Sequence, residues 1–136
     1  MKRVTGIGGI FFKCDDPEKT KEWYNKHLGI QSDKYGVMFQ WRKAGDPDKK
    51  GCTVWGPFEE KTEYFSPSKK PFMLNYRVEN LEKLLEALKE EGVEVVGEME
   101  TYDYGKFGWV MDPEGNKLEL WEPLDSKLSG ATMDQD

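Results

Sequence analysis

The 136 residues carry 20 Lys and Arg against 26 Asp and Glu, which gives a formal net charge of −6. This balance argues against a nucleic-acid binder, which needs a basic face to displace counterions. A chain with 37% hydrophobic and 13% aromatic residues is not expected to be disordered. The chain shows no signal-peptide pattern and no apolar run of the roughly 20 residues that span a bilayer. Its two cysteines are too few for a disulfide scaffold. We therefore expect a cytoplasmic protein that binds neither nucleic acid nor membrane.

The first half of the chain predicts one helix among strands. Strands are expected at about residues 4–14, 37–43 and 51–56, the last two separated by a Gly-Asp-Pro-Asp turn. Asp16 is a suitable N-cap, and Pro17 suits the first helical position. Gly29 then provides a left-handed stop.

The second half predicts the same order of elements. Strands are expected at about residues 72–78, 93–101, 106–111 and 116–122. Asn80 is a suitable N-cap, and Gly92 ends the helix. Between them the leucines fall at helical spacing, at Leu81, Leu84, Leu85 and Leu88.

Short matches at a nearly constant offset indicate an internal repeat. Residues 11–16 match residues 75–80 at an offset of 64. The Trp-x-Pro segment at residues 53–57 matches residues 119–123 at an offset of 66, and Asp-Pro-Asp at 46–48 repeats at the same offset. Three matches in the same element order favour duplication over chance.

The repeat predicts a single α+β domain over residues 1–124, built from two βαβββ modules. Module one covers residues 1–57 and module two covers residues 72–124. A linker rich in Pro, Ser and Lys joins them at residues 58–71, and a polar C-terminal tail follows at residues 125–136.

Strand alternation divides the predicted side chains between two faces. An apolar face, expected under the helices, holds Ile10, Phe12, Cys14, Cys52, Val54, Leu74, Tyr76, Val78, Leu118 and Leu120. The opposite, mixed face holds Gly9, Phe11, Lys13, Thr53, Trp55, Met73, Asn75, Arg77, Glu119 and Trp121. Either the mixed face lines a ligand cavity or a partner subunit shields it, and its aromatic and polar composition favours the cavity.

Three segments carry a resemblance to a known family. Asp16 is followed by Trp23-Tyr24 and by Leu28-Gly29, residues 78–81 open the second helix, and residues 112–121 read Asp-Pro-Glu-Gly-Asn-Lys-Leu-Glu-Leu-Trp. In these features residues 3–123 resemble the vicinal oxygen chelate superfamily, which includes glyoxalase I, extradiol dioxygenases and bleomycin-resistance proteins. The resemblance implies a curved mixed sheet around a cavity, a small-molecule ligand and a homodimer.

The resemblance also implies four metal positions, one on each of four strands. Carried over, they fall on Gly9, Thr53, Met73 and Glu119, of which only Glu119 is a suitable ligand for a hard or borderline metal. The chain has a single histidine, His27, expected in the last turn of the first helix. We therefore expect no metal ligands and no cofactor, with a divalent metal disfavoured.

Glu119 is the candidate catalytic residue. It acts as a general base, pairs with a cationic ligand, or simply neutralises Lys13 or Arg77 on the same face. Lys13 and Arg77 precede the two helices at equivalent places in the repeat. Either they jointly bind an anion, or they lie exposed and pair with Asp15 or Glu79.

The remaining candidate residues are aromatic or polar and are expected to contact a ligand. They are Phe11, Lys13, Trp55, Asn75, Arg77, Trp109 and Trp121. Tyr64 and Phe65 in the linker either cover the site as a lid or fasten the linker to the surface.

Three functional hypotheses remain open. The favoured one is a glyoxalase/bleomycin-resistance-like protein that binds a small organic molecule in an aromatic-lined cavity without a metal. The first alternative is a metal-independent enzyme with Glu119 as general base. The second is a divalent-metal-dependent lyase or dioxygenase of the glyoxalase type.

Overall fold

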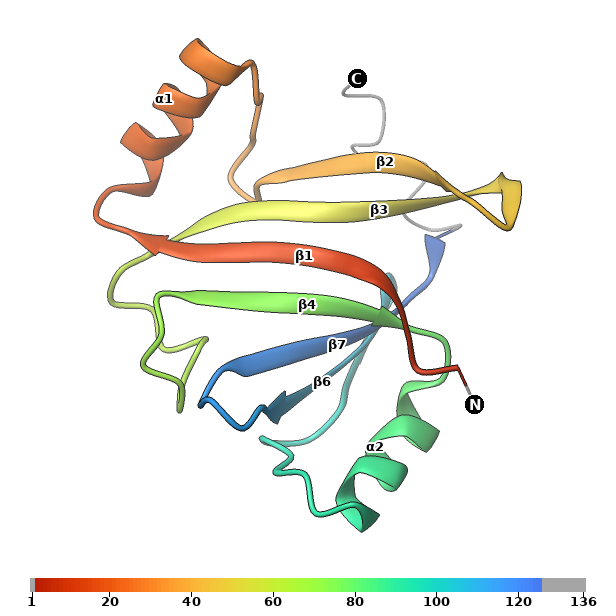
Figure 1. Ribbon diagram of the computed structural model, residues 1–136. Coiled ribbons are helices and arrows are strands. Elements are labelled where there is room, and N and C mark those ends of the chain that lie inside the picture. The colour runs from red at the N-terminus through yellow and green to blue at the C-terminus, as the bar shows by residue number, and fades with distance from the viewer. Residues whose placement is uncertain (1, 126–136) are drawn as a thin grey trace.

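One mixed sheet of seven strands, flanked by two helices, makes up residues 2–125, the part of the chain that the computed structural model describes (Figure 1). The elements are β1 (Val4–Cys14), α1 (Pro17–Leu28), β2 (Val37–Lys43), β3 (Asp46–Glu59), β4 (Phe72–Val78), α2 (Leu81–Glu90), β5 (Glu100–Tyr102), β6 (Gly105–Met111) and β7 (Lys117–Pro123). The strand order is β2-β3-β1-β4-β7-β6-β5. The expected tail lies outside the described residues except for Asp125.

The predicted repeat is visible in the sheet. β1 and β4 pair antiparallel at the centre, and each pairs on its other side with a parallel strand, β3 or β7. An antiparallel hairpin partner, β2 or β6, then completes each half. The α+β class and the mixed sheet are confirmed. Within the described residues the first half has one strand fewer, because the counterpart of β5 is reduced to an isolated bridge between Asp33 and Gly36.

Both helices begin and end as the sequence predicts. The side chains of Asp16 and Asn80 each accept a hydrogen bond of 3.2 Å from a backbone N–H in the first helical turn. Gly29 (φ +71°) and Gly92 (φ +84°) have the left-handed backbone that follows a helix end. Neither helix is long and apolar enough to cross a membrane, as judged over residues 2–125.

The helices differ in how they pack. The leucines of α2 enter a core cluster with strand residues of the second half, namely Leu81, Leu84, Leu85, Val78, Val110 and Leu120. In contrast, α1 buries none of its residues, and Trp23 on it is 53% exposed. Figure 1 shows the two helices at separate parts of the sheet. The second half therefore contains the better-formed helix–sheet core.

Two strand boundaries differ from the prediction. β3 begins at Asp46, directly after a turn at Ala44 and Gly45, so the Asp-Pro-Asp sequence lies in the strand. Residues 93–99 do not form a continuous strand, and only Glu100–Tyr102 is assigned to β5. The alternating apolar residues of this segment pack against the core instead, since Val93 and Val95 contact the cluster formed by the leucines of α2.

The predicted facing of β3 is wrong. The Trp55 ring lies 4.8 Å from Tyr24 of α1 and 5.5 Å from Phe12, on the helix side of the sheet. Cys52 and Val54 instead pack with Trp121 on the opposite side. The repeat aligned Thr53 with Glu119, but Gly56 pairs with Phe11 as Glu119 pairs with Asn75, so the alignment of the halves is three residues out in β3. A shift by an odd number of residues reverses every side chain of a strand. We call the face that carries Asn75, Glu119 and Trp121 the inner face.

Candidate functional site

Strand register places three polar side chains together on the inner face. Glu119 of β7 lies opposite Asn75 of β4 and opposite Trp109 of β6. Its carboxylate is buried, with 3% of the residue exposed. Asn75 Nδ2 donates to Oε1 over 2.6 Å, and Trp109 Nε1 donates to Oε2 over 2.9 Å.

A third donor comes from the connection between β3 and β4. The Tyr64 hydroxyl donates a short hydrogen bond to Oε2 of Glu119. Burial raises the pKa of the Tyr64 phenol, and the negative charge of Glu119 raises it further. Tyr64 therefore stays protonated at neutral pH and acts as a donor to the carboxylate.

Lys117 completes this polar group from the same face of β7. Its ammonium donates to the Tyr64 carbonyl over 2.8 Å and lies 5.4 Å and 5.6 Å from the ring centres of Tyr64 and Trp109. Burial lowers the pKa of Lys117. The nearby cation and the three neutral donors together balance the buried charge of Glu119.

Aromatic side chains fill the space beside this polar group. Phe65, from the same connection, is completely buried and packs with Met73 and Trp109. Phe11 and Phe58 pack against the same cluster. The space expected as a ligand cavity beside Glu119 is thus occupied by the protein's own side chains.

The four positions carried over as metal ligands do not form a metal site. Met73 is completely buried in the aromatic cluster, and Gly9 has no donor side chain. The Thr53 hydroxyl donates to the Ile7 carbonyl over 2.7 Å and accepts from Trp41, on a strand whose inner-facing residues are Cys52 and Val54. Among residues 2–125, no three His, Cys, Asp or Glu side chains group as metal ligands would. The donor set does not fit a divalent metal.

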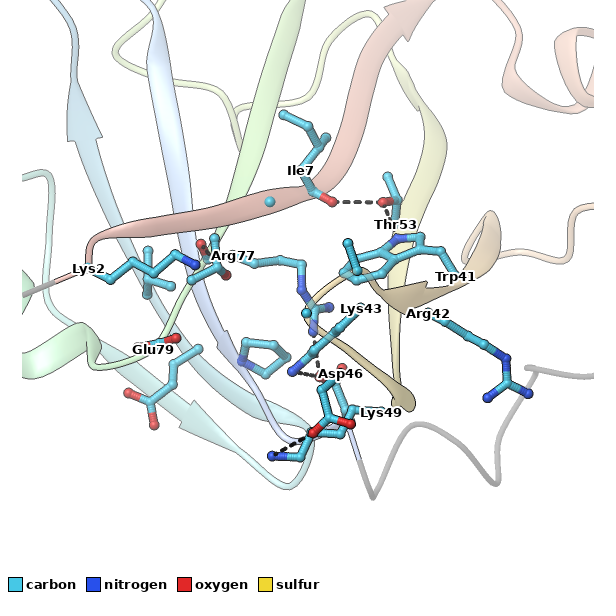
Figure 2. Close-up of a pocket in the computed structure, with 18 residues that line it drawn as sticks. Lys2, Ile7, Trp41, Arg42, Lys43, Asp46, Lys49, Thr53, Arg77 and Glu79 are labelled. Carbon is cyan, nitrogen blue, oxygen red and sulfur yellow. Dashed lines mark hydrogen bonds and ion pairs between the residues drawn. The ribbon is translucent and has the colours of Figure 1, made fainter.

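An open cavity lies elsewhere, at the end of the sheet where the β2–β3 turn, the start of β1 and the end of β7 meet (Figure 2). Its volume is about 800 Å³. Trp41, Thr53 and Arg77 contribute to its wall. The only glycine of the β2–β3 turn, Gly45, and Gly6 of β1 also line it, so the backbone is accessible at two places.

Arg77 is the central charged group of this cavity. Only 2% of the residue is exposed. Nη1 donates to the Cys52 carbonyl over 3.0 Å, and Nη2 pairs with Oδ2 of Asp125 at 2.5 Å. The guanidinium carbon lies 4.9 Å from the Trp41 ring and 5.5 Å from the Trp121 ring. The guanidinium of Arg77 is thus held in one direction by the position of the residue in β4, by the Cys52 carbonyl and by the two indole rings.

The structure separates the two cations that the sequence places at equivalent positions. β1 and β4 are antiparallel, and Arg77 lies opposite Gly6. Lys13 is seven residues further along β1, about 20 Å away at the usual rise of a strand. It lies instead near the Phe65 ring, at 5.6 Å. A joint clamp by Lys13 and Arg77 is therefore wrong, and so is pairing of Glu119 with either cation.

The other predicted site residues fall into three places. Asn75, Trp109 and Glu119 form the buried polar group, and Phe11 belongs to the aromatic cluster beside it. Trp121 lies against Arg77. Trp55, by contrast, lies on the helix side of the sheet and contacts neither group.

Several residues of these two sites were not singled out from the sequence. Lys117 alternates with Glu119, so strand periodicity was a usable signal for it. Lys43 enters the cavity through the β2–β3 hairpin, as does Trp41, whose facing the sequence leaves open. Asp125 follows the last strand and had no local pattern to mark it.

Comparisons with known proteins agree with this architecture. The family model for the Glyoxalase/Bleomycin resistance protein/Dioxygenase superfamily matches residues 6–120. Methylmalonyl-CoA epimerase from Mycobacterium tuberculosis is a structural neighbour with a TM-score of 0.59 and 21% identity, covering 96% of this chain and 95% of the epimerase. A single-residue variant of the Streptomyces coelicolor methylmalonyl-CoA epimerase has a TM-score of 0.65 and 16% identity, covering 89% of this chain and 99% of that one.

A Mn(II)-bound glyoxalase from Novosphingobium aromaticivorans is also similar, with a TM-score of 0.60 and 15% identity. The match covers 90% of this chain but 40% of the glyoxalase. No curated protein sequence matches the chain significantly. At these identities the structural neighbours show the fold, and the family model covers most of the sequence. The chain therefore belongs to the Glyoxalase/Bleomycin resistance protein/Dioxygenase superfamily.

Proposed function

We propose that this protein binds a small organic molecule, without a metal ion, in the cavity beside Arg77. The observation that carries the proposal is the cavity itself, about 800 Å³ in volume with a buried guanidinium and an indole in its wall. Such a volume suits a ligand of drug or metabolite size, and a few fixed polar groups among apolar ones are typical of binding sites.

Chemistry at Glu119 is less well supported. A general base must reach the proton that it removes. Both carboxylate oxygens of Glu119 already accept hydrogen bonds from Tyr64, Asn75 and Trp109, and Phe65 fills the adjacent space. Catalysis by Glu119 would require the connection that carries Tyr64 and Phe65 to move away first.

The binding site can be tested by filling the cavity from Gly6. A Cβ atom built there would meet its nearest neighbours, Arg77 Cδ and Trp41 Cη2, at 3.9 and 4.0 Å, which is ordinary contact. Gly6→Ala is thus expected to fold and bind normally, whereas Gly6→Leu places a larger side chain in the cavity. Ligand-detected NMR with a panel of small aromatic acids, amines and neutral compounds would measure binding to both variants.

We expect some compounds to bind the wild type and Gly6→Ala but not Gly6→Leu, with thermal unfolding used to show that both variants are folded. Binding that is unchanged in Gly6→Leu would place the site elsewhere. A panel in which nothing binds the wild type would refute the proposed function. Turnover of a bound compound that is lost in Glu119→Gln would favour the metal-independent enzyme instead.

Exposed apolar side chains on β1 and β2 support a homodimer as part of this proposal. Ile7 and Ile10 of β1 and Phe39 of β2 are 43%, 42% and 45% exposed. Exposed large apolar side chains on one part of a sheet are typical of an interface. Ile10→Glu is expected to give monomers in sedimentation analysis, and Tyr102→Glu, on the opposite edge strand, is not. A monomeric wild type would contradict this.

A further inference from the structure

The charged groups around Arg77 indicate which ligands the cavity accepts. Resting on the proposed function, we infer that the cavity binds organic carboxylates, and that the carboxylate of Asp125 occupies the position of the ligand's carboxylate until a ligand displaces it. The chain would thus carry its own competing anion at the end of β7.

The first step in this inference is the burial of Arg77. A guanidinium that is 2% exposed must have an anionic or strongly polar partner, because a buried unpaired charge is costly. One side of it is satisfied by the Cys52 carbonyl, which belongs to the sheet. The other side points to Asp125, two residues beyond the end of β7. The anionic partner is therefore the part of this arrangement that does not belong to the sheet.

The second step is that Asp125 satisfies this site incompletely. Its Oδ2 atom receives Arg77 Nη2 and lies 3.7 Å from Lys43 Nζ. Its Oδ1 atom is buried and has no hydrogen-bond partner among the described residues. A guanidinium can instead bind both oxygens of a carboxylate in a parallel, two-bond arrangement. A free ligand can adopt that geometry, whereas Asp125 is held by the Leu124 N–H bond of 3.2 Å to the Tyr104 carbonyl.

The third step is the charge of the cavity wall. Five Lys and Arg line it, Lys2, Arg42, Lys43, Lys49 and Arg77, against four carboxylates, Asp46, Glu79, Glu122 and Asp125. When Asp125 leaves, five cations face three carboxylates. This excess is local, because the whole chain carries a net charge of −6. The wall is thus suited to an anion in a protein that is otherwise acidic.

The fourth step concerns the body of the ligand. The Trp41 indole is held by the hydrogen bond of 2.9 Å from its Nε1 to Thr53 Oγ1. Its ring faces the guanidinium at 4.9 Å and lines the cavity. A fixed indole beside a cation can contact the flat face of an aromatic acid whose carboxylate reaches Arg77. Aromatic carboxylates are therefore the appropriate probes.

The test compares 2-naphthoate with its neutral analogue 2-naphthamide by isothermal titration calorimetry. The variants are Asp125→Asn, which removes the internal anion, and Asp48→Asn as a matched control. Asp48 is an exposed residue near the start of β3 that does not line the cavity, so its substitution makes the same change of charge outside the site. We expect Asp125→Asn to bind 2-naphthoate about tenfold more tightly than the wild type, with little change for 2-naphthamide or for Asp48→Asn.

A second measurement does not depend on any variant. In the wild type, 2-naphthoate should shift the backbone amide resonance of Asp125, because displacement moves that residue. The inference is overturned if Asp125→Asn binds 2-naphthoate no more tightly than the wild type, if 2-naphthamide binds equally well, or if the Asp125 amide does not respond. In each of these cases, binding of other compounds to the cavity would leave the proposed function standing. Failure of every compound in the panel would instead refute the proposed function itself.

Discussion

Truncation of the Glu119 side chain should strongly destabilise the fold, because three buried donors depend on its carboxylate. Glu119→Ala removes the acceptor for three buried donors, the Tyr64 hydroxyl, Trp109 Nε1 and Asn75 Nδ2. Each buried donor left without a partner costs about 1–3 kcal/mol. Some donors will find water or rotate, so we expect a loss of about 4 kcal/mol in the free energy of unfolding.

Glu119→Gln should cost less, because the three hydrogen bonds can be kept. The Gln carbonyl can accept from Tyr64 and Trp109, and its amide can donate to Asn75 once the Asn75 amide group has turned over. Asn75 Oδ1 is buried and has no hydrogen-bond partner among the described residues, so this turn sacrifices no existing bond. Neutral hydrogen bonds are about 1 kcal/mol weaker than charged ones, which gives an expected loss of about 2 kcal/mol.

Urea unfolding followed by tryptophan fluorescence at pH 7 would measure both variants. Glu114→Ala serves as a control because this carboxylate is exposed in the β6–β7 turn, and it should change stability by less than about 0.5 kcal/mol. The reasoning would be refuted if Glu119→Ala lost less than about 1 kcal/mol, or if the glutamine variant were the less stable of the two.

Three further predictions concern the same sheet. The raised pKa of Tyr64 means that the unfolded phenol, with a pKa near 10, ionises first, so wild-type stability falls as pH rises. From pH 9 to 11 the wild type should lose about 1.4 kcal/mol more than Tyr64→Phe in urea titrations, and parallel curves would contradict this. Gly8→Ala should cost about 2 kcal/mol in the same assay, because its Cβ would lie 2.1 Å from Asn75 Oδ1, while Gly6→Ala should be nearly neutral. Elemental analysis should find no stoichiometric metal in purified protein, and nickel, zinc, manganese or iron(II) should raise the unfolding midpoint by less than about 1 °C. A bound metal lost in Glu119→Ala would revive the metal-dependent lyase or dioxygenase.

Local signals account for the elements that were predicted correctly. The caps at Asp16 and Asn80 and the stops at Gly29 and Gly92 depend on side chains and backbone angles within a few residues. The leucines of α2 likewise show their buried face by spacing alone.

The side chains of a strand were assigned to the correct face of the sheet only where the internal repeat had been aligned in the correct register. In β4 and β7 the alternation placed Asn75 and Glu119 together, as the structure shows. In β3 the internal repeat was aligned three residues out, an odd number, which placed Trp55 on the wrong face. Register is set by pairing with β1 and β2, and the local sequence does not encode it.

The cavity could not be located from the sequence at all. Tyr64 and Phe65 come from a connection whose path is decided by tertiary packing, and they fill the space beside Glu119. The open cavity instead depends on the β2–β3 turn and on Asp125, which are distant in sequence from Arg77.

The sequence by itself thus determined the family, the duplicated α+β fold and the helix ends. These follow from residue identity and from short-range periodicity. Only the tertiary structure decided that Glu119 is buried among neutral donors and that Arg77 and Asp125 meet in an open cavity. The physical reason is that strand register and loop packing bring together residues far apart in the chain, and these contacts depend on the whole core.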